Sequence, residues 1–494
     1  MYRSFALTLA AALAAPPLAA ACPDSIATKL STQVTPALDR LAADGRFSGV
    51  VLVACDGRSI YEKAYGMADR AKGIPNRVET RFNLGSMNKM WTAIAIAQLV
   101  EEGKVDVNAP VGRYLPDLPN AALRDSVLVR HLLTHTSGLG SYFQRGYLRD
   151  RVPLARAADL QRFFVDDPLA FSPGARFQYS NAGFAVLGMI VERVSGQNYF
   201  DYMRTSVLAR AQMRTAAFLT LPITDAAVAV GYATPPGASS AMSNAELVER
   251  SSSPAGGAYA SAQDMVAFSR ALWSGRLVPA ARVAEFTAGK VDMGGLKYAY
   301  GFGEGVFGGW REVGHNGGAP GVSTDFKSFP DRGLDLVVLA NIDEAANEAM
   351  PLLVGAITGM RLRMARDEPG PGMPRGPSAS AAGAGSASTV FPDSPIGRRA
   401  AAFLEASNAG TAAMERFIAE QMVPNDATPA ERAARGAPMR ERNGKLRLIE
   451  VIAAAGDEIV FIVESATEGR LEMRMRVEAA SPQRVVGVMV GQMR

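Results

Sequence analysis

The stretch GSMNK, residues 85–89, opens an apolar run from Met90 to Val100 that ends before Gly103. Because this run is apolar on nearly every face, it predicts a buried helix, with Gly103 suited to its C-terminal cap. Ser86 and Lys89 are three residues apart, so they share a face near the helix N-terminus, where the dipole and free N–H groups favour negative charge. A partly dehydrated lysine amine can accept the proton of a serine hydroxyl. The pattern indicates Ser86 as a nucleophile and Lys89 as its base.

The same spacing is also typical of an N-capping serine beside a solvated lysine, so this motif decides nothing by itself. An unpartnered lysine inside so apolar a helix costs free energy, however, and that cost favours a functional role.

A second candidate segment is YSN, residues 179–181, which precedes an apolar helical pattern over residues 184–194. One interpretation is a buried tyrosine followed by an asparagine that caps the helix. The functional interpretation places the phenol of Tyr179 near Ser86 as a proton relay and lets Asn181 donate to a substrate carbonyl.

The third segment, GHNGG at residues 314–318, lies at the end of a predicted strand. Glycines there let a substrate backbone approach closely and leave N–H groups uncovered, so His315, Gly317 and Gly318 are candidate substrate-binding residues. A single histidine is more often structural, and only the ordered set of three segments favours function. We expect His131 and His135 to be buried, hydrogen-bonded residues rather than members of a Ser-His-Asp triad.

The flanking segments predict an α+β fold. An amphipathic helix over residues 28–44 is followed by strands at 47–54 and 59–66 around the turn Asp56-Gly57. Residues 84–220 are mainly helical in pattern, and strands return at 310–315, 321–329 and 334–341 before a helix over 345–364. This order predicts a sheet assembled from both chain ends, flanked by helices, with a helical insertion. The cleft between sheet and insertion is the expected site.

The catalytic domain is expected over residues 22–366, followed by a flexible linker at 367–392 that is rich in Pro, Gly, Ser and Ala. Residues 393–494 predict a small α+β domain with helices at 396–408 and 411–422 and four strands from residue 445 onward. This domain loosely resembles helix-plus-curved-sheet modules of the NTF2-like type. It contains neither cysteine nor histidine, and we assign no chemistry to it.

The N-terminus predicts export. Arg3, an apolar run and three small residues ending at Ala21 describe a secretory signal peptide over residues 1–21, so we expect a periplasmic or secreted protein. Lipid anchoring at Cys22 is the less favoured alternative, because the leucine usual three residues before such a cysteine stands one place earlier, at Leu18. The two cysteines, Cys22 and Cys55, are compatible with one disulfide or with two unpaired thiols.

Composition limits the partners. The 494 residues carry a formal net charge of +4 without a run of lysine or arginine, so we do not expect nucleic-acid binding. Nor do we expect an integral membrane span. With three histidines and no clustered metal ligands, we expect no metal site and no cofactor. The expected partner is a small-molecule or peptide substrate, and the sequence does not indicate the oligomeric state.

In this order and at this separation, the three segments resemble those of the class C β-lactamase-related family of β-lactamases, D-alanyl-D-alanine peptidases, serine esterases and D-aminopeptidases. The stretches VRHLLTHTSGL at 129–139, AGG at 255–257 and SAQDM at 261–265 are similar to family segments as well. The resemblance covers residues 28–364. It implies a β-lactamase/transpeptidase-like fold with an antiparallel sheet, and a two-step acyl transfer through an acyl-enzyme.

The resemblance also implies roles for single residues. It makes Ser86 the acylated nucleophile and Lys89 its base. Tyr179 becomes the second proton-transfer residue and Asn181 a substrate-holding residue. The oxyanion hole would consist of the backbone N–H groups of Ser86 and Gly318.

The third segment departs from the pattern of dedicated β-lactamases of this class, which carry lysine where this chain has His315. Histidine is mostly neutral near pH 7. We therefore expect an esterase or amide hydrolase first, a D-amino-acid-specific peptidase second and a β-lactamase third. A catalytically silent penicillin-binding scaffold is the rival hypothesis, against which the three intact motifs argue.

Overall fold

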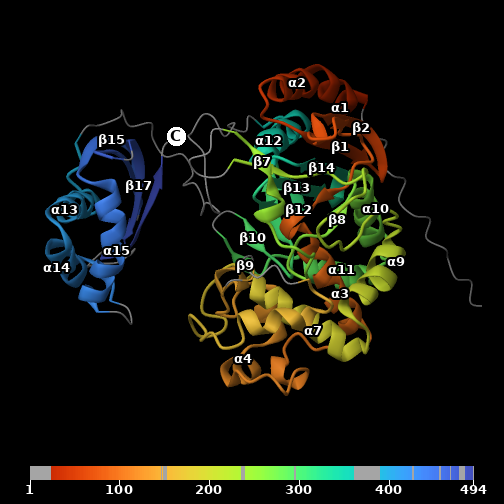
Figure 1. Cartoon of the computed structure of the whole chain (residues 1–494), viewed down its shortest axis with the longest axis horizontal. Coiled ribbons are helices and arrows are strands. Elements are labelled where there is room, and N and C mark those ends of the chain that lie inside the picture. Colours follow the sequence, from red (N-terminus) through yellow and green to blue (C-terminus); the bar gives the residue numbers. More distant parts are fainter. Residues whose placement is uncertain are drawn as a thin grey trace, which may run out of the picture. The chain divides into compact units, whose positions relative to one another are not determined.

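The computed structural model describes residues 24–145, 147, 153–234, 240–293, 296–360, 390–424, 428–455, 458–467, 469–477 and 484–492. They belong to two compact units, one within Met1–Met364 and one within Ala365–Arg494 (Figure 1). The predicted signal peptide, residues 1–21, and Cys22 lie outside the described residues, as does the predicted linker up to residue 389.

An eight-stranded antiparallel sheet runs through the first unit in the order β2-β1-β14-β13-β12-β11-β10-β9. β1 pairs with β14 along its whole length, from Gly49 opposite Ala340 to Cys55 opposite Leu334. The sheet is therefore assembled from both ends of this unit, and the predicted α+β class is confirmed. The strands are β1 (Gly49–Cys55), β2 (Arg58–Tyr65), β9 (Val291–Asp292), β10 (Lys297–Tyr298), β11 (Gly303–Phe307), β12 (Trp310–Ala319), β13 (Val322–Phe329) and β14 (Leu334–Ala340).

Alternation along β1 divides the core between the two faces of the sheet. Val50 and Leu52 belong to the apolar cluster of one face, and Val51 and Val53 to that of the other. Because successive side chains point to opposite faces and both faces are covered, all seven residues of β1 are buried. Helix α10 (Ala262–Trp273) packs on the first face; α1 (Asp24–Lys29), η1 (Leu30–Val34), α2 (Thr35–Ala43) and α12 (Ala345–Thr358) cover the second.

The helical insertion shares the apolar cluster of the first face and lies away from α1 and α2 (Figure 1). The predicted buried helix is confirmed as α3, in which every residue from Lys89 to Leu99 is buried. Ser86 itself lies on a separate 3-10 turn, η2 (Gly85–Asn88), directly before α3. The other helices of this region are α4 (Ala121–Ser126), α5 (Val129–Leu133), α7 (Asn181–Ser195), α8 (Tyr199–Tyr202), α9 (Ala209–Ala211) and α11 (Ala280–Thr287).

Short elements complete the first unit. Cys55, at the end of β1, is disulfide-bonded, which rules out the alternative of two unpaired thiols. The short strands are β3 (Met67–Asp69), β4 (Ile74–Pro75), β5 (Phe82–Asn83), β6 (Tyr232–Ala233), β7 (Met242–Ser243) and β8 (Tyr259–Ala260). The other short helices among the described residues are the π-helix η6 (Met203–Leu208) and the 3-10 helices η3 (Val111–Arg113), η4 (Tyr142–Arg145), η5 (Ala157–Phe163), η7 (Asn244–Glu246) and η8 (Pro330–Arg332).

The second unit has its own apolar core around Phe417, Phe461 and Met473. Its four-stranded sheet has the order β15-β16-β17-β18 and accompanies three helices, of which the sequence predicted two. The elements are α13 (Pro395–Ala409), α14 (Thr411–Gln421), α15 (Pro429–Asn443), β15 (Leu446–Ala455), β16 (Glu458–Ser465), β17 (Gly469–Val477) and β18 (Val485–Gln492). Across the described residues of both units, no helix combines the length and apolar character that a bilayer span requires.

Candidate active site

The turn that carries Ser86 is packed against the glycine-rich end of β12. Gly85 has a φ of 51°, a left-handed conformation that favours glycine. A Cβ added to Gly317 would lie 1.9 Å from the backbone oxygen of Leu84, and one added to Gly85 would lie 2.8 Å from the backbone nitrogen of Gly318. Two segments far apart in sequence can meet here because no side chain stands between them.

Replacing Gly317 with alanine is therefore expected to push the Ser86 turn away from β12. The added Cβ would meet a backbone oxygen, which cannot rotate aside, so we expect a loss of about 1–3 kcal/mol in stability and much slower labelling of Ser86 by a fluorophosphonate. Thermal unfolding and labelling rates measure the two effects. Gly140→Ala, where nothing lies within 4 Å of an added Cβ, is the control. A Gly317→Ala variant that unfolds and reacts like the wild type would contradict this account.

Lys89 is wholly buried, and its amine lies 3.0 Å from the hydroxyl oxygen of Ser86. The amine also donates to the side-chain oxygen of Asn181 at 2.7 Å and to the backbone oxygen of Ala255. These two oxygens can only accept hydrogen bonds, whereas a hydroxyl can accept or donate. A neutral amine therefore satisfies all three contacts, with its two N–H groups on the oxygens and its lone pair facing the Ser86 hydroxyl.

Burial supplies the reason for the amine to be neutral. It lowers the pKa of Lys89 to about 7, against a smaller opposite effect of the Glu249 carboxylate. A large fraction of the molecules therefore has an unprotonated Lys89 amine at neutral pH. The structure thus brings an amine of lowered pKa within hydrogen-bond distance of the Ser86 hydroxyl.

Tyr179 lies beside this pair, on the segment that leads into α7. The Lys89 amine is 4.8 Å from the centre of the Tyr179 ring. The phenol oxygen is buried and makes no hydrogen bond of normal distance and angle with a described residue, although the Ser86 hydroxyl is near enough to lower its pKa slightly. Burial outweighs this effect and raises the pKa of Tyr179 above its ordinary value. The phenol therefore keeps its proton at neutral pH and is available as a proton donor.

His135 packs against the ring of Tyr179. The two ring centroids are 4.1 Å apart, and Nδ1 of His135 accepts a hydrogen bond from the backbone N–H of Ser180 at 3.1 Å. Burial lowers the pKa of His135 well below its ordinary value, so the ring is neutral. His131, which is only partly buried, accepts from the backbone N–H of Leu128 at 3.2 Å. The hydrogen bonding expected of both histidines is confirmed, as is the burial of His135, but the burial expected of His131 was wrong.

His315 reaches the site from β12 as a neutral ring. Its Nδ1 contacts the backbone oxygen of Asn316, which can only accept, so Nδ1 carries the proton and Nε2 accepts from the Tyr298 hydroxyl at 3.0 Å. Burial lowers the pKa of His315 to about 3, and the charge of Lys89 adds to this effect. The third segment therefore presents no fixed positive charge to a substrate.

Ser86 opens into a pocket of about 220 Å³. Asn181 and Gly318 line this pocket with Ser86, whereas Gly317 lies behind it against Leu84. The Asn181 oxygen is engaged by Lys89, which leaves the amide nitrogen for a substrate carbonyl. Apolar side chains form much of the remaining wall: Phe143, Leu219, Leu221, Val248 and Ala255.

Sequence reasoning missed one carboxyl group in this pocket, that of Glu249. The Tyr142 hydroxyl donates to its Oε1 at 3.1 Å, and burial raises the pKa of Glu249 to about 7. No motif marks Glu249, because the segment around it has neither helical nor strand periodicity. Among the described residues, no group of three or more His, Cys, Asp or Glu side chains is placed to hold a metal ion.

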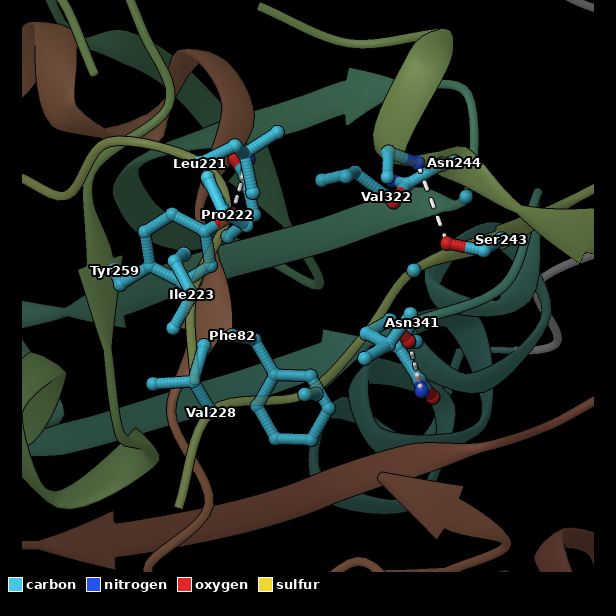
Figure 2. A pocket seen from close by; sticks show the side chains of 17 residues that line it. Phe82, Leu221, Pro222, Ile223, Val228, Ser243, Asn244, Tyr259, Val322 and Asn341 are labelled. Carbon is cyan, nitrogen blue, oxygen red and sulfur yellow. Dashed lines mark hydrogen bonds between the residues drawn. The ribbon is translucent and has the colours of Figure 1, made fainter. Parts of the chain in front are cut away.

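A second pocket, of about 140 Å³, adjoins the first and shares Asn83, Leu221 and Tyr259 with it. Figure 2 shows apolar side chains on one side of it and the amides of Asn244 and Asn341 on the other. Both amides are engaged: Asn244 donates to the backbone oxygen of Pro320 and Asn341 to that of Val230, each at 2.8 Å. This second pocket is therefore a neutral cavity next to the Ser86 pocket. Its apolar lining includes Phe82, Pro222, Ile223, Val228 and Val322.

The family model described as Beta-lactamase matches residues 34–356. Esterase EstB of Burkholderia gladioli is 36% identical over 208 residues, which are 39% of this chain and 53% of EstB, so the chain spans about half of that relative's length. Penicillin-binding protein 4* of Bacillus subtilis is 28% identical over 341 residues, 64% of this chain and 73% of that protein.

Among solved structures, a penicillin binding protein from Bacillus halodurans superposes with a TM-score of 0.59 at 31% identity. The similarity covers 65% of this chain and 98% of that one.

Proposed function

Because the chain belongs to the β-lactamase family of serine hydrolases, we propose that it hydrolyses an ester or amide through an acyl-enzyme on Ser86. The observation that carries the proposal is the buried amine of Lys89, 3.0 Å from the Ser86 hydroxyl and satisfied by its three neighbours when neutral. A buried charged lysine with no carboxylate bonded to it is costly, whereas a buried neutral amine is a base.

In the proposed first step, Ser86 Oγ bonds to the substrate carbonyl carbon as its proton moves to the Lys89 amine. The carbonyl oxygen becomes negative and is stabilised by the N–H groups of Ser86 and Gly318, donors typically worth about 3 kcal/mol each. The bond to the leaving group then breaks, and the leaving group takes a proton from Tyr179 or Lys89. In the second step, water attacks the acyl carbon and gives a proton to Lys89 or Tyr179. The bond between that carbon and Ser86 Oγ then breaks, Ser86 Oγ takes up a proton from the same groups, and the acid leaves.

A neutral His315 favours substrates that are not held by a carboxylate. A substrate carboxylate binds best to a fixed positive charge, and the pKa of about 3 leaves His315 uncharged. We therefore place simple esters first and D-amino-acid amides or peptides second. β-Lactams, whose carboxylate needs a cation, come third.

A substrate panel tests this proposal. We expect turnover of p-nitrophenyl esters that exceeds turnover of nitrocefin and D-alanyl-D-alanine peptides, and a fluorophosphonate adduct on the peptide that contains Ser86. Mass spectrometry of the labelled digest locates the adduct. A chain that turns over no member of the panel and forms no adduct would be a binding scaffold, against the proposal.

The rate should increase with pH through neutrality. Protonated Lys89 has no lone pair, so we expect kcat/KM to be low below about pH 6 and to reach a plateau above about pH 8, around the pKa of about 7. The carboxyl of Glu249 titrates in the same range and faces Lys89, so the midpoint belongs to the pair. A pH–rate profile on a neutral ester measures it, and a flat profile from pH 5.5 to 8.5 would argue against an amine base.

Asn181→Asp gives a directional check on this assignment. A carboxylate in place of the amide would lie within hydrogen-bond distance of the Lys89 amine and favour its charged form. The acidic limb of the profile should therefore move to higher pH, whatever the variant loses in substrate binding. If the pH midpoint of the acidic limb does not change in Asn181→Asp, the rate depends on the titration of a group other than Lys89.

We also propose that the protein acts outside the cytoplasm. The disulfide bond of Cys55 supports an oxidising compartment, and the pattern of residues 1–21 supports export. Fractionation of cells that express the full chain, with N-terminal sequencing of the mature protein, tests this proposal.

A further inference from the structure

The pocket beside Ser86 contains a carboxyl group, that of Glu249. Glu249 lines this pocket, and no arginine, lysine or histidine forms an ion pair with it within the described part of the chain. Lys89 acts on it only as a nearby charge. Arg250 also lines the pocket, but its guanidinium donates to the backbone oxygen of Leu221. The pocket thus presents an anion whose protein partners are hydroxyl groups.

The two carboxyl oxygens of Glu249 differ in their surroundings. Oε1 accepts from the Tyr142 hydroxyl at 3.1 Å, and Tyr142 in turn lies 3.1 Å from the Ser253 hydroxyl. Oε2 lies on the side of Gly257, where an added Cβ would be 3.4 Å away, and Gly257 lines the same pocket. The Ser253 hydroxyl also hydrogen-bonds to the Glu249 carboxyl group and favours its charged form. The Glu249 side chain is anchored by these hydroxyls but is still partly exposed where it lines the pocket.

An anchored carboxylate in a largely apolar pocket is a costly arrangement unless a cation completes it. Phe143, Leu219 and Val248 line the same pocket with apolar side chains, which lower the local polarity and strengthen a charge interaction there. Nothing in the proposed reaction on Ser86 requires this carboxylate, since Lys89 and Tyr179 already supply the proton transfers. A cationic group on the substrate would supply such a partner.

We propose that Glu249 is a specificity-determining residue that selects esters or amides whose acyl part carries a cationic nitrogen. The inference rests on the proposed function and adds the substrate class. The cation would lie at Oε2 while the acyl carbonyl lies between Ser86 and Gly318. The conservative change Glu249→Gln keeps an oxygen for the Tyr142 hydroxyl and removes only the charge.

A pair of p-nitrophenyl esters of the same shape tests this inference, 4-(trimethylammonio)butanoate against the neutral 5,5-dimethylhexanoate. We expect Glu249→Gln to lower the cationic-to-neutral ratio of kcat/KM at least about tenfold, through a loss on the cationic ester. Glu79→Gln, at an exposed position, should leave the ratio unchanged. A cationic-to-neutral ratio that stays at the wild-type value in Glu249→Gln would overturn the inference. This includes an equal loss of kcat/KM on both esters, which a purely structural role would produce.

The ratio should also depend on pH in one direction. The substrate charge is permanent, and Glu249, with a pKa of about 7, is largely protonated at pH 5.5 and ionised at pH 8.5. The groups that face it are Lys89, Tyr142, Tyr147 and the neighbouring Arg250, and the tyrosines keep their protons over this range. Preference for the cationic ester should therefore rise with pH in wild type and stay flat in Glu249→Gln.

Binding without turnover separates this inference from the proposed function. Calorimetry on Ser86→Ala with 4-(trimethylammonio)butanamide and with neutral 5,5-dimethylhexanamide reports recognition alone. Tighter binding of the cationic amide that is lost in the Ser86→Ala/Glu249→Gln double variant would support the inference even if wild type hydrolysed neither ester. Equal affinity for the two amides would overturn it even if the esters were hydrolysed.

Discussion

Lys89→Met is expected to slow acylation of Ser86 by about 10²–10⁴-fold, because it removes the base that lies 3.0 Å from the hydroxyl. Methionine fills nearly the same volume among the apolar neighbours of α3. It also removes a group whose charged form is costly to bury, although the oxygens of Asn181 and Ala255 lose their donor. We expect the two effects to offset each other, with stability changed by no more than about 2 kcal/mol. The fold should persist while the reaction does not.

Fluorophosphonate labelling rates measure the loss of acylation, and denaturant unfolding measures the change in the free energy of unfolding. Lys104→Met, at an exposed lysine just beyond α3, is the matched control and should label like wild type. Between pH 7 and 10.5 the unfolded lysine binds a proton that native Lys89 does not, so the stability of wild type relative to Lys89→Met should rise with pH over that range. Labelling of Lys89→Met at the wild-type rate would contradict the assignment of the base.

Ser86→Ala is expected to abolish the covalent adduct and to lower kcat/KM by about 10⁴–10⁶-fold. The oxygen that forms the acyl bond is gone, whereas the pocket, Lys89 and Asn181 stay in place. Because Ser86 is only partly buried and alanine fits within the space of serine, we expect wild-type stability. A loss of activity would then result from the missing Ser86 hydroxyl and not from unfolding.

Intact-protein mass spectrometry after incubation with a fluorophosphonate and with a slow ester checks this prediction. Ser31→Ala, at an exposed serine of η1, should form the adduct as wild type does. An adduct that persists in Ser86→Ala would place the nucleophile elsewhere, and hydrolysis without any adduct would point to direct attack by water.

Much of the first unit could be predicted because its signals are local. The turn Asp56-Gly57 between two β-rich segments predicts a hairpin, and the structure shows φ of 47° and 72° at these residues. The apolar run after Lys89 predicts a helix that is buried all round, because no face of it can be left in water. Both features depend only on residues that are neighbours along the chain.

Other elements could not be predicted because their signals are short or weak. Strands β9 and β10 have two residues each, too few for an alternation of faces to appear. Helix α15 is mostly polar, and its best signal is the capping box of Thr428 and Glu431, which no apolar run follows. Glu249 escaped notice because a carboxylate in a segment without periodicity looks like any surface residue.

Sequence by itself determined which chemical groups are available and which of them share a face. Ser86 and Lys89 are neighbours through local geometry alone, as any two residues three apart on a helical turn must be. Only the tertiary structure decided that Lys89 also meets Asn181 and Ala255, and that its amine is dry enough for a pKa of about 7. Dehydration is a property of everything packed around a group, and those neighbours come from α7 and from the loop before β8. The reactivity that we propose for Ser86 depends on that packing.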